Sequence, residues 1–195
     1  MGIAQEREGN PQCLYSCCSK YKFSAIEELC SRDVVEGSII EVGVYRGGMG
    51  MHLAMIFPNR PVYLVDTFTG IPYSSEHDNF YRPGHFANVN VDDVRKSFHS
   101  YPNAIIMQGI FPGQIVERFN SRIVFAVVHI DVDIYQGYKD CLEYFYPRVP
   151  RGGIVFLDDY LEPECRGATV ACEEFMRNVP ETIQELTGQR YFIKE

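Results

Sequence analysis

The stretch SIIEVGVYRGGMGMHLA, residues 38–54, changes its character twice. An apolar run leads into a cluster of glycines, after which apolar residues return at helical spacing. The pattern predicts a short buried strand over 39–43, a tight turn, and a helix over 48–57 that ends before Pro58. Junctions of this kind commonly hold a ligand at the N-terminus of the helix.

Strand-like and helix-like stretches alternate along the rest of the chain. Further strands are predicted over 62–66, 104–109, 125–133 and 152–160, and a terminal hairpin over 181–186 and 189–195. Further helices are predicted over 22–34, 91–99, 136–149 and 165–178. Ser24 is predicted as the N-cap of the first helix, with Glu27 at the capping-box position. Because strands separated by helices form parallel sheets with both faces covered, we predict an α/β fold.

Length and composition limit the classes of protein that fit. The 195 residues suffice for one domain with a full core, predicted over 21–195 after a flexible, cysteine-containing arm over 1–20. The net charge of −8 argues against a nucleic-acid binder, which normally presents a basic face. No apolar run approaches the ~20 residues of a membrane span. The first ten residues lack the apolar core of a signal peptide, so we expect a cytoplasmic protein.

The seven cysteines are predicted to be free thiols. Their number is odd and the chain shows no export signal, which argues against a disulfide framework. Cys13, Cys17 and Cys18 cluster near the N-terminus, but a fourth regularly spaced ligand is missing because Lys20 stands at its place. Metal binding or oxidation of this cluster stays open.

Acidic residues follow the ends of the predicted strands. They are Asp66, Asp131, Asp133, Asp158 and Asp159, with Glu41 beside them at the end of the first strand. Because the carboxyl ends of parallel strands meet at one edge of the sheet, we expect these side chains to lie close together. Crowding so many anions is costly unless a cation or hydrogen-bond donors compensate them. Oxygen-only ligands suit a hard cation such as Mg²⁺.

The glycine turn itself indicates the ligand. It reads Glu-x-Gly-x-x-x-Gly-Gly, which is neither the dinucleotide-binding Gly-x-Gly-x-x-Gly nor a phosphate-binding loop with its lysine. The acid at its start, Glu41, suits the cationic end of a ligand, and Asp66 at the end of the next strand suits a ribose diol. A nucleoside that carries a cationic amino-acid tail matches S-adenosylmethionine.

Five stretches give a more specific indication. They are EVGVYRGGMG (41–50), LVDTFTGIP (64–72), VDDVRKSF (91–98), IDVDIYQGYKDCLEYFYPRVPRGGIVFLDDY (130–160) and CRGATVACEEF (165–175). In them the sequence resembles the macrocin O-methyltransferase (TylF-type) family of S-adenosylmethionine-dependent enzymes. The resemblance implies a Rossmann-like class I methyltransferase fold, with a mostly parallel seven-strand sheet, a reversed last strand and helices on both faces. It also implies methyl transfer to a hydroxyl of a small molecule, often a sugar of a natural product, with Mg²⁺ and in a homodimer or larger homo-oligomer.

The resemblance assigns roles to individual residues. Asp131, Asp158 and Asp159 would be the metal ligands, and Asp133 the catalytic base. The residues that would flank the methionine end of the cofactor are Glu41, Gly43, Tyr45 and Gly47. Asp66 would hold the ribose, and the residues beside the adenine would be Gly109, Ile110 and Phe111.

The polar segment 67–90 is too long for a simple connection, and loops of this length are commonly functional or disordered. We expect a mobile lid in which His85 contacts the acceptor and takes part in catalysis. Two other functions stay open at this point. The Asp-x-Asp of IDVD also occurs in metal-dependent glycosyltransferases, and a protein that binds S-adenosylmethionine without turnover would keep the same turn.

Overall fold

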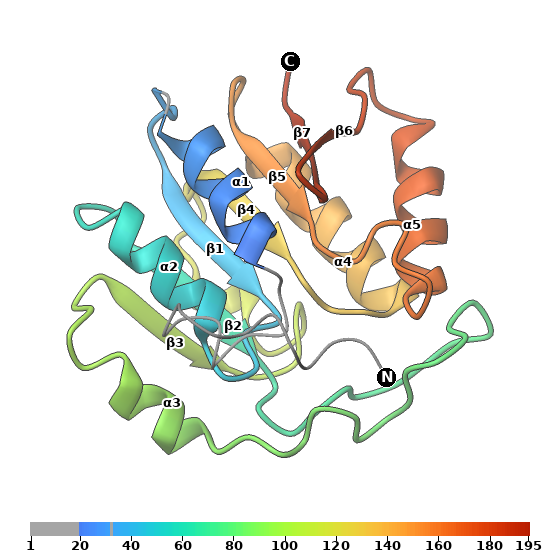
Figure 1. The fold of residues 1–195 in the computed structure, drawn as a ribbon, viewed down its shortest axis with the longest axis horizontal. Coiled ribbons are helices and arrows are strands. Elements are labelled where there is room, and N and C mark those ends of the chain that lie inside the picture. The colour runs from blue at the N-terminus through green and yellow to red at the C-terminus, as the bar shows by residue number, and fades with distance from the viewer. Residues whose placement is uncertain (1–19, 32) are drawn as a thin grey trace.

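The computed structural model describes residues 20–31 and 33–195, so the predicted cysteine-containing arm lies outside the described residues apart from Lys20. A seven-stranded sheet in the order β3-β2-β1-β4-β5-β7-β6 forms the centre of the molecule (Figure 1). Its strands are β1 (Ser38–Val42), β2 (Val62–Asp66), β3 (Ala104–Gln108), β4 (Phe125–Ile130), β5 (Ile154–Leu157), β6 (Gln184–Leu186) and β7 (Gln189–Ile193). The helices are α1 (Lys20–Cys30), α2 (Gly48–Ile56), α3 (Val91–Ser97), α4 (Tyr135–Phe145) and α5 (Arg166–Met176), with short 3-10 helices η2 (Val116–Arg118) and η3 (Tyr146–Arg148).

Strands β1 to β5 pair parallel with one another, and β7 is inserted antiparallel between β5 and β6. The mostly parallel sheet with a reversed last strand is therefore confirmed.

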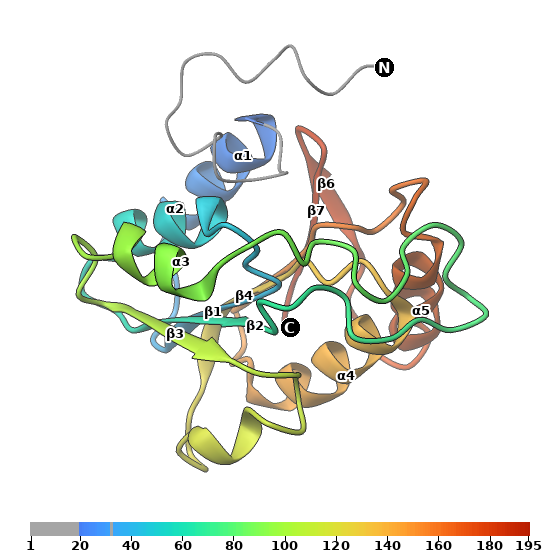
Figure 2. The ribbon, with the colours of Figure 1, turned by 90° about the horizontal axis from the view of Figure 1, so that it is seen from below.

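Helices cover both faces of the sheet (Figure 2). One hydrophobic core joins the sheet to α1, α2 and α3 and includes Phe23 and Phe98. The other joins the opposite face to α4 and α5 and includes Phe145. Neighbouring residues of the central strand β4, such as Val127 and Val128, point into opposite cores. This two-sided burial is why the strand is almost entirely apolar.

The prediction that Ser24 caps the first helix is wrong. The helix begins at Lys20, and the Ser24 hydroxyl donates a hydrogen bond to the carbonyl of Lys20, 3.3 Å away, from within the helix. Phe23, Ile26 and Leu29 form the buried stripe of α1, so the helix has to be formed before residue 24 in order to place Phe23 in the core.

Two strands end earlier than predicted, and this places the acidic residues on loops. The ladder between β1 and β4 ends at the pair Val42 and Ile130, and the amide of Asp131 donates the last hydrogen bond, to the carbonyl of Val42 (2.9 Å). Strand β5 ends at Leu157. The carboxylates that follow both strands therefore lie at the carboxyl edge of the sheet, where open α/β sheets bind their ligands.

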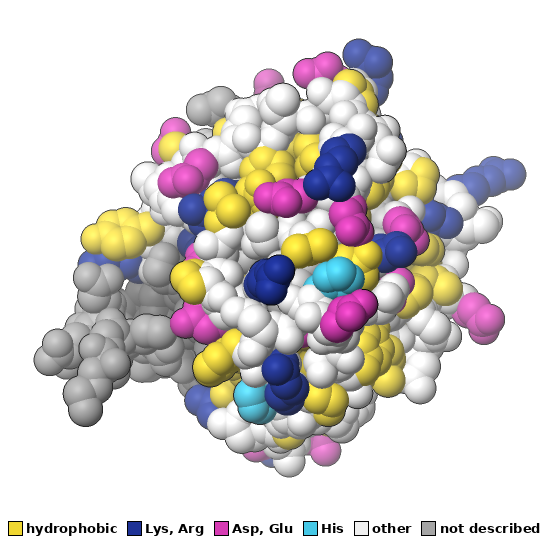
Figure 3. Space-filling model, turned by 90° about the vertical axis from the view of Figure 1, so that its right-hand side faces the viewer, with side chains coloured by type: hydrophobic (Ala, Val, Ile, Leu, Met, Phe, Trp, Pro, Cys, Tyr) yellow, Lys and Arg dark blue, Asp and Glu magenta, His cyan; other side chains and the backbone are white. Residues whose placement is uncertain are grey.

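The surface of the described part of the molecule is mixed. On the side shown in Figure 3, Lys and Arg side chains lie among Asp and Glu side chains and single hydrophobic ones. None of the helices described in the structure has both the length and the apolar character needed to cross a bilayer.

Candidate functional site

Three carboxylates meet at the carboxyl edge of the sheet. Asp131 follows β4, and Asp158 and Asp159 follow its neighbour β5. One ligand oxygen from each of the three lies within 4.8 Å of the others, which is the spacing of groups that share one cation. The structure thus brings together the three residues that the resemblance assigned to a metal.

The electrostatics of this cluster favour a bound cation. Removal from water, and then the charge of Asp158, raises the pKa of Asp131 well above its usual range. Burial and the same neighbour raise the pKa of Asp159 to about 6. Asp158 behaves in the opposite way, because the His129 imidazole and the Lys22 ammonium outweigh its burial and lower its pKa. Without a cation, the cluster therefore tends to keep protons.

Lys22 and His129 belong to the site, although neither was predicted from the sequence. Lys22 reaches over from α1, with its Nζ 3.1 Å from Oδ2 of Asp158 and 3.4 Å from Oε1 of Glu162. His129 is fully buried, with its two ring nitrogens 3.6 Å from carboxylate oxygens of Glu41 and Asp158. The one available signal was a histidine inside the otherwise apolar run FAVVHI. No such signal marks Lys22, because a lysine on an amphipathic helix is ordinary.

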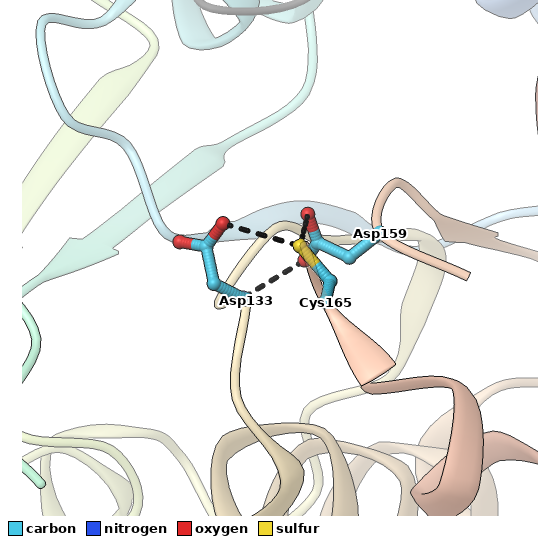
Figure 4. Close-up of side chains that lie close together, drawn as sticks. All are labelled: Asp133, Asp159 and Cys165. Atoms are coloured by element: carbon cyan, nitrogen blue, oxygen red, sulfur yellow. Dashed lines mark hydrogen bonds between the residues drawn. The ribbon is translucent and has the colours of Figure 1, made fainter. Parts of the chain in front are cut away.

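Asp133 lies beside the cluster and is held by Asp159 and Cys165 (Figure 4). Its backbone amide donates a 2.9 Å hydrogen bond to Oδ2 of Asp159. The Cys165 sulfur lies 3.7 Å from Oδ1 of Asp133 and 3.8 Å from Oδ1 of Asp159. Burial and the nearby Asp159 charge raise the pKa of the Cys165 thiol, which therefore stays protonated and can donate to either carboxylate. Sequence reasoning did not assign Cys165 to the site.

The glycine turn is shaped by Asp66 as well as by its glycines. One carboxylate oxygen of Asp66 accepts hydrogen bonds from the amides of Val44 and Tyr45, both at 2.7 Å. The other accepts from the amide of Phe68, also at 2.7 Å. Asp66 therefore ties the turn after β1 to the loop after β2, and this structural role stands beside the predicted contact with a ribose.

Gly43 and Gly47 are required by packing within the protein. Gly43 has φ +91°, and a Cβ there would overlap the backbone carbonyl of Asp131. Gly47 has φ +88° at the N-cap of α2, where a Cβ would press on the ring of Phe98, the residue that follows α3. Both glycines let segments of the chain approach closely.

Glu41 is the buried carboxylate of the turn. Its side chain is 1% exposed, and its Oε2 has no hydrogen-bond partner among the described residues. Burial, followed by the charges of Asp66 and Asp158, raises its pKa well above the usual range. A buried carboxylate oxygen without a hydrogen-bond partner is costly, so a ligand that brought a cation or a hydrogen-bond donor to Oε2 would be favoured.

Two adjoining cavities open at this edge. The larger cavity, about 710 Å³, is lined by the three clustered carboxylates Asp131, Asp158 and Asp159 and also by Glu41 and Tyr45. A volume of this size falls in the range of small-molecule sites. The smaller, about 100 Å³, lies over β2 and β3 and is lined by Asp66, Gly109, Ile110 and Phe111 among others. Both are lined by Gly43, Phe86, Asp131 and Asp133, so these residues stand where the two cavities join.

Two of the predicted site residues line neither cavity. Gly47 is buried beneath α3, as described above. His85 is exposed, and its ring packs against the rings of Tyr81 and Phe80 at centroid distances of 5.8 and 6.2 Å. Tyr81 lines the larger cavity instead, although the sequence favoured His85.

Comparison with known proteins gives a consistent assignment. The family model of the macrocin-O-methyltransferases (TylF) matches residues 8–193. The chain is 31% identical over 159 residues to demethyldecarbamoylnovobiocin O-methyltransferase of Streptomyces niveus, covering 71% of this chain and 60% of that protein. It is also 31% identical over 157 residues to mycinamicin III 3''-O-methyltransferase of Micromonospora griseorubida, covering 72% and 62%. The chain thus spans about three fifths of the length of these curated relatives.

Solved structures share the fold. The O-methyltransferase NovP superposes with a TM-score of 0.78 at 24% identity, covering 92% of this chain and 82% of NovP. The calicheamicin methyltransferase CalS11 gives a TM-score of 0.78 at 19% identity, covering 98% and 88%. At these identities the likeness establishes the class I methyltransferase architecture alone.

Proposed function

The chain belongs to the TylF macrocin-O-methyltransferase family, and on this premise we propose that it transfers a methyl group from S-adenosylmethionine to a hydroxyl group of a small molecule. The observation that carries the proposal is the meeting of Asp131, Asp158 and Asp159 beside Asp133, where the two cavities join. Two of the relatives are named for methyl transfer to demethyldecarbamoylnovobiocin and to mycinamicin III. We infer that the acceptor here is likewise a natural product or a sugar attached to one.

The two cavities divide the cofactor between them in this proposal. Asp66 and the backbone over 109–111 would hold the adenosine part in the smaller cavity. Its volume of about 100 Å³ requires the lining to open when the nucleoside enters. Glu41 and Tyr45 would flank the methionine part at the edge of the larger cavity. The buried, unpartnered Oε2 of Glu41 supports this arrangement, because the ammonium group of the cofactor would satisfy it.

The donor set of the cluster fits Mg²⁺. All three predicted ligands offer carboxylate oxygens, the hard ligands that Mg²⁺ prefers, and their crowding needs a positive charge. When bound there, the cation would lower the pKa of an acceptor hydroxyl. His129 and Lys22 lie beside Asp158 and together lower its pKa against the effect of burial, which keeps that carboxylate ionised.

Asp133 is the residue that takes the proton in this mechanism. The acceptor oxygen forms a bond to the methyl carbon, the carbon–sulfur bond breaks with its electron pair going to sulfur, and S-adenosylhomocysteine leaves. The hydroxyl proton passes to the carboxylate of Asp133. Burial and the charge of Asp159 raise the pKa of Asp133, which makes it a stronger base than an exposed aspartate. Asp159 and Cys165 hold it in place.

The test is direct transfer of a labelled methyl group. The purified protein, Mg²⁺ and methyl-tritiated S-adenosylmethionine would be incubated with demethyldecarbamoylnovobiocin, with mycinamicin III and with a crude host extract. We expect label in a product, together with S-adenosylhomocysteine. Binding of S-adenosylmethionine without any label transfer would favour the non-catalytic alternative. Tight binding of UDP-glucose in place of S-adenosylmethionine would favour the glycosyltransferase alternative and contradict the proposal.

A further inference from the structure

One buried carboxylate, that of Asp78, joins the segment 67–90 to the start of α4. Asp78 is 7% exposed, and its Oδ1 accepts a 2.8 Å hydrogen bond from the amide of Tyr135, the first residue of α4. Its Oδ2 accepts from both the amide (2.7 Å) and the hydroxyl (2.8 Å) of Ser75. The carboxylate therefore closes a small turn of the segment and joins that turn to the start of α4.

Gly167, in the first turn of α5, makes room for this carboxylate. A Cβ at Gly167 would overlap Oδ1 of Asp78 and lie 2.8 Å from the amide of Tyr135. The next residue of the segment, Asn79, reinforces the attachment through the chain that leads into α5. Its side chain donates to the carbonyl of Pro163 (2.9 Å) and accepts from the amide of Arg166 (3.2 Å). We call Asp78 and Asn79 the anchor of the segment.

Tyr81 stands two residues after the anchor and lines the larger cavity, as do Asp133 and Asp159. Its ring packs against Phe86 and Phe80 at centroid distances of 5.2 and 5.1 Å. Burial, followed by the charge of Asp133, raises the pKa of its phenol, so the hydroxyl keeps its proton and can donate a hydrogen bond.

We propose that Tyr81 contacts the acceptor in the larger cavity and that Asp78 is the positioning residue that holds Tyr81 there. The contact between Tyr81 and an acceptor rests on the proposed function, whereas the attachment of the segment by Asp78 does not. Phe80, 55% exposed beside Tyr81, adds an apolar surface at the same wall. The contacts favour a fixed wall over the mobile lid that the composition of 67–90 suggested, and hydrogen exchange decides between the two.

The first test measures the anchor without any acceptor. Amide exchange over 75–90 is compared in wild type, Asp78→Ala and Gly167→Ala, with the exposed Glu76→Ala as the matched control. We expect slow exchange in wild type and in the control, and exchange faster by about tenfold or more in both anchor variants. Fast exchange in the free wild type, or unchanged exchange in both anchor variants, would overturn the anchor.

The second test observes Tyr81 itself. Fluorine NMR of protein labelled with 3-fluorotyrosine, with the Tyr81 signal assigned through Tyr81→Phe, is recorded with and without Mg²⁺ alone. We expect the Tyr81 signal to shift on adding Mg²⁺ in wild type and in Glu76→Ala. In Asp78→Ala the Tyr81 signal should become narrower, because the ring moves more freely, and it should no longer shift when Mg²⁺ is added. A Tyr81 signal that is the same in wild type and Asp78→Ala would contradict the positioning role.

The third test uses whichever acceptor accepts label in the methyl-transfer assay. Tyr81→Ala and Asp78→Ala should raise the KM for that acceptor by about tenfold or more, while the Kd for S-adenosylmethionine stays within about twofold. Tyr81→Phe keeps the aromatic ring, so its acceptor KM should rise less than that of Tyr81→Ala. An unchanged acceptor KM in Tyr81→Ala would remove Tyr81 from the acceptor site. If no acceptor is methylated, the proposed function fails, and the exchange and fluorine tests still decide whether Asp78 positions Tyr81.

Discussion

The amide of Asp133 donates a hydrogen bond to Oδ2 of Asp159, 2.9 Å away, and so joins the loop after β4 to the loop after β5. Asp133 has φ +62°, a left-handed conformation that costs a non-glycine residue free energy. The hydrogen bond that Asp133 donates to Asp159 helps to hold this conformation, and the Asp133 side chain lines both cavities. The proposed base and one proposed metal ligand are therefore joined directly.

Replacing Asp133 should affect turnover and leave binding almost unchanged. Asp133→Asn keeps the size of the side chain and the backbone amide that contacts Asp159, but it removes the proton acceptor. We expect kcat to fall by ~10²–10⁴-fold, the usual contribution of a positioned base. The Kd values for Mg²⁺ and S-adenosylmethionine, measured by calorimetry, should stay near those of wild type. The exposed Asp92→Asn on α3 is the control. Normal turnover in Asp133→Asn would leave the base unidentified, with His85 as the next candidate to replace.

Replacing the carboxylates of the cluster should weaken the binding of Mg²⁺, in contrast to the replacement of Asp133. Asp131→Asn and Asp158→Asn each remove one charged ligand, so we expect a weaker Mg²⁺ affinity, with activity partly restored by added Mg²⁺. EDTA should abolish the activity of wild type, and Mg²⁺ should restore it. Steady-state rates across a Mg²⁺ titration give the measurement. Full activity in EDTA would exclude a metal from the mechanism.

The pH dependence of metal binding follows from Asp159. Burial and the charge of Asp158 raise the pKa of Asp159 to about 6 in the metal-free protein. Below that pH the cation has to displace the Asp159 proton in addition to any proton held by Asp131, so the apparent Mg²⁺ affinity should fall by about tenfold or more per pH unit. Calorimetry in two buffers of different ionisation enthalpy should show protons released on binding near pH 6. Binding that is independent of pH between about 5 and 7 would contradict a role for Asp159 as a ligand.

The same shift predicts the stability of the metal-free protein. A raised folded-state pKa means that the folded protein holds the proton more tightly than the unfolded chain, in which an aspartate has a pKa of about 4. The stabilisation is fully present below pH ~4 and is lost as the pH rises through about 6. The Tm of wild type relative to Asp159→Asn should therefore fall between about pH 5 and pH 7.5. Mg²⁺ should raise the wild-type Tm at the higher pH, and a relative Tm that rises with pH would contradict the assignment.

Replacing Gly43 should lower the stability of the protein even when no cofactor is bound. In Gly43→Ala the new Cβ overlaps the carbonyl of Asp131 and the residue keeps an unfavourable positive φ, so we expect a loss of about 2–4 kcal/mol in the free energy of unfolding. Gly84→Ala is the matched control, because Gly84 has φ +90° but nothing within 4 Å of a Cβ. It should lose only the backbone contribution, about 1–2 kcal/mol. Urea unfolding measures the loss of free energy in each variant. Equal losses would show that the backbone around residue 43 shifts to accommodate the new Cβ at no cost.

Local sequence patterns were sufficient for the elements and for their arrangement in layers. The short runs SIIEV and FAVVHI are typical of buried strands, and the apolar side chains of FAVVHI alternate between the two covered faces of the sheet. The acids after β4 and β5 follow from the same logic, since the ends of adjacent parallel strands meet at one edge. The reversed last strand and the assignment of roles came from the resemblance to the family.

Only the tertiary structure decided which residues complete the site. Lys22 lies more than a hundred positions before Asp158, and α1 brings them together because its apolar stripe packs on the sheet. Tyr81 and His85 have similar surroundings in the sequence, yet Asp78 fits against Gly167 and turns Tyr81 toward the cavity. Strands and helices reflect the periodicity of neighbouring residues, so they can be predicted from the chain alone. Contacts between distant segments depend on the space that the folded backbone leaves, and no local pattern encodes that space.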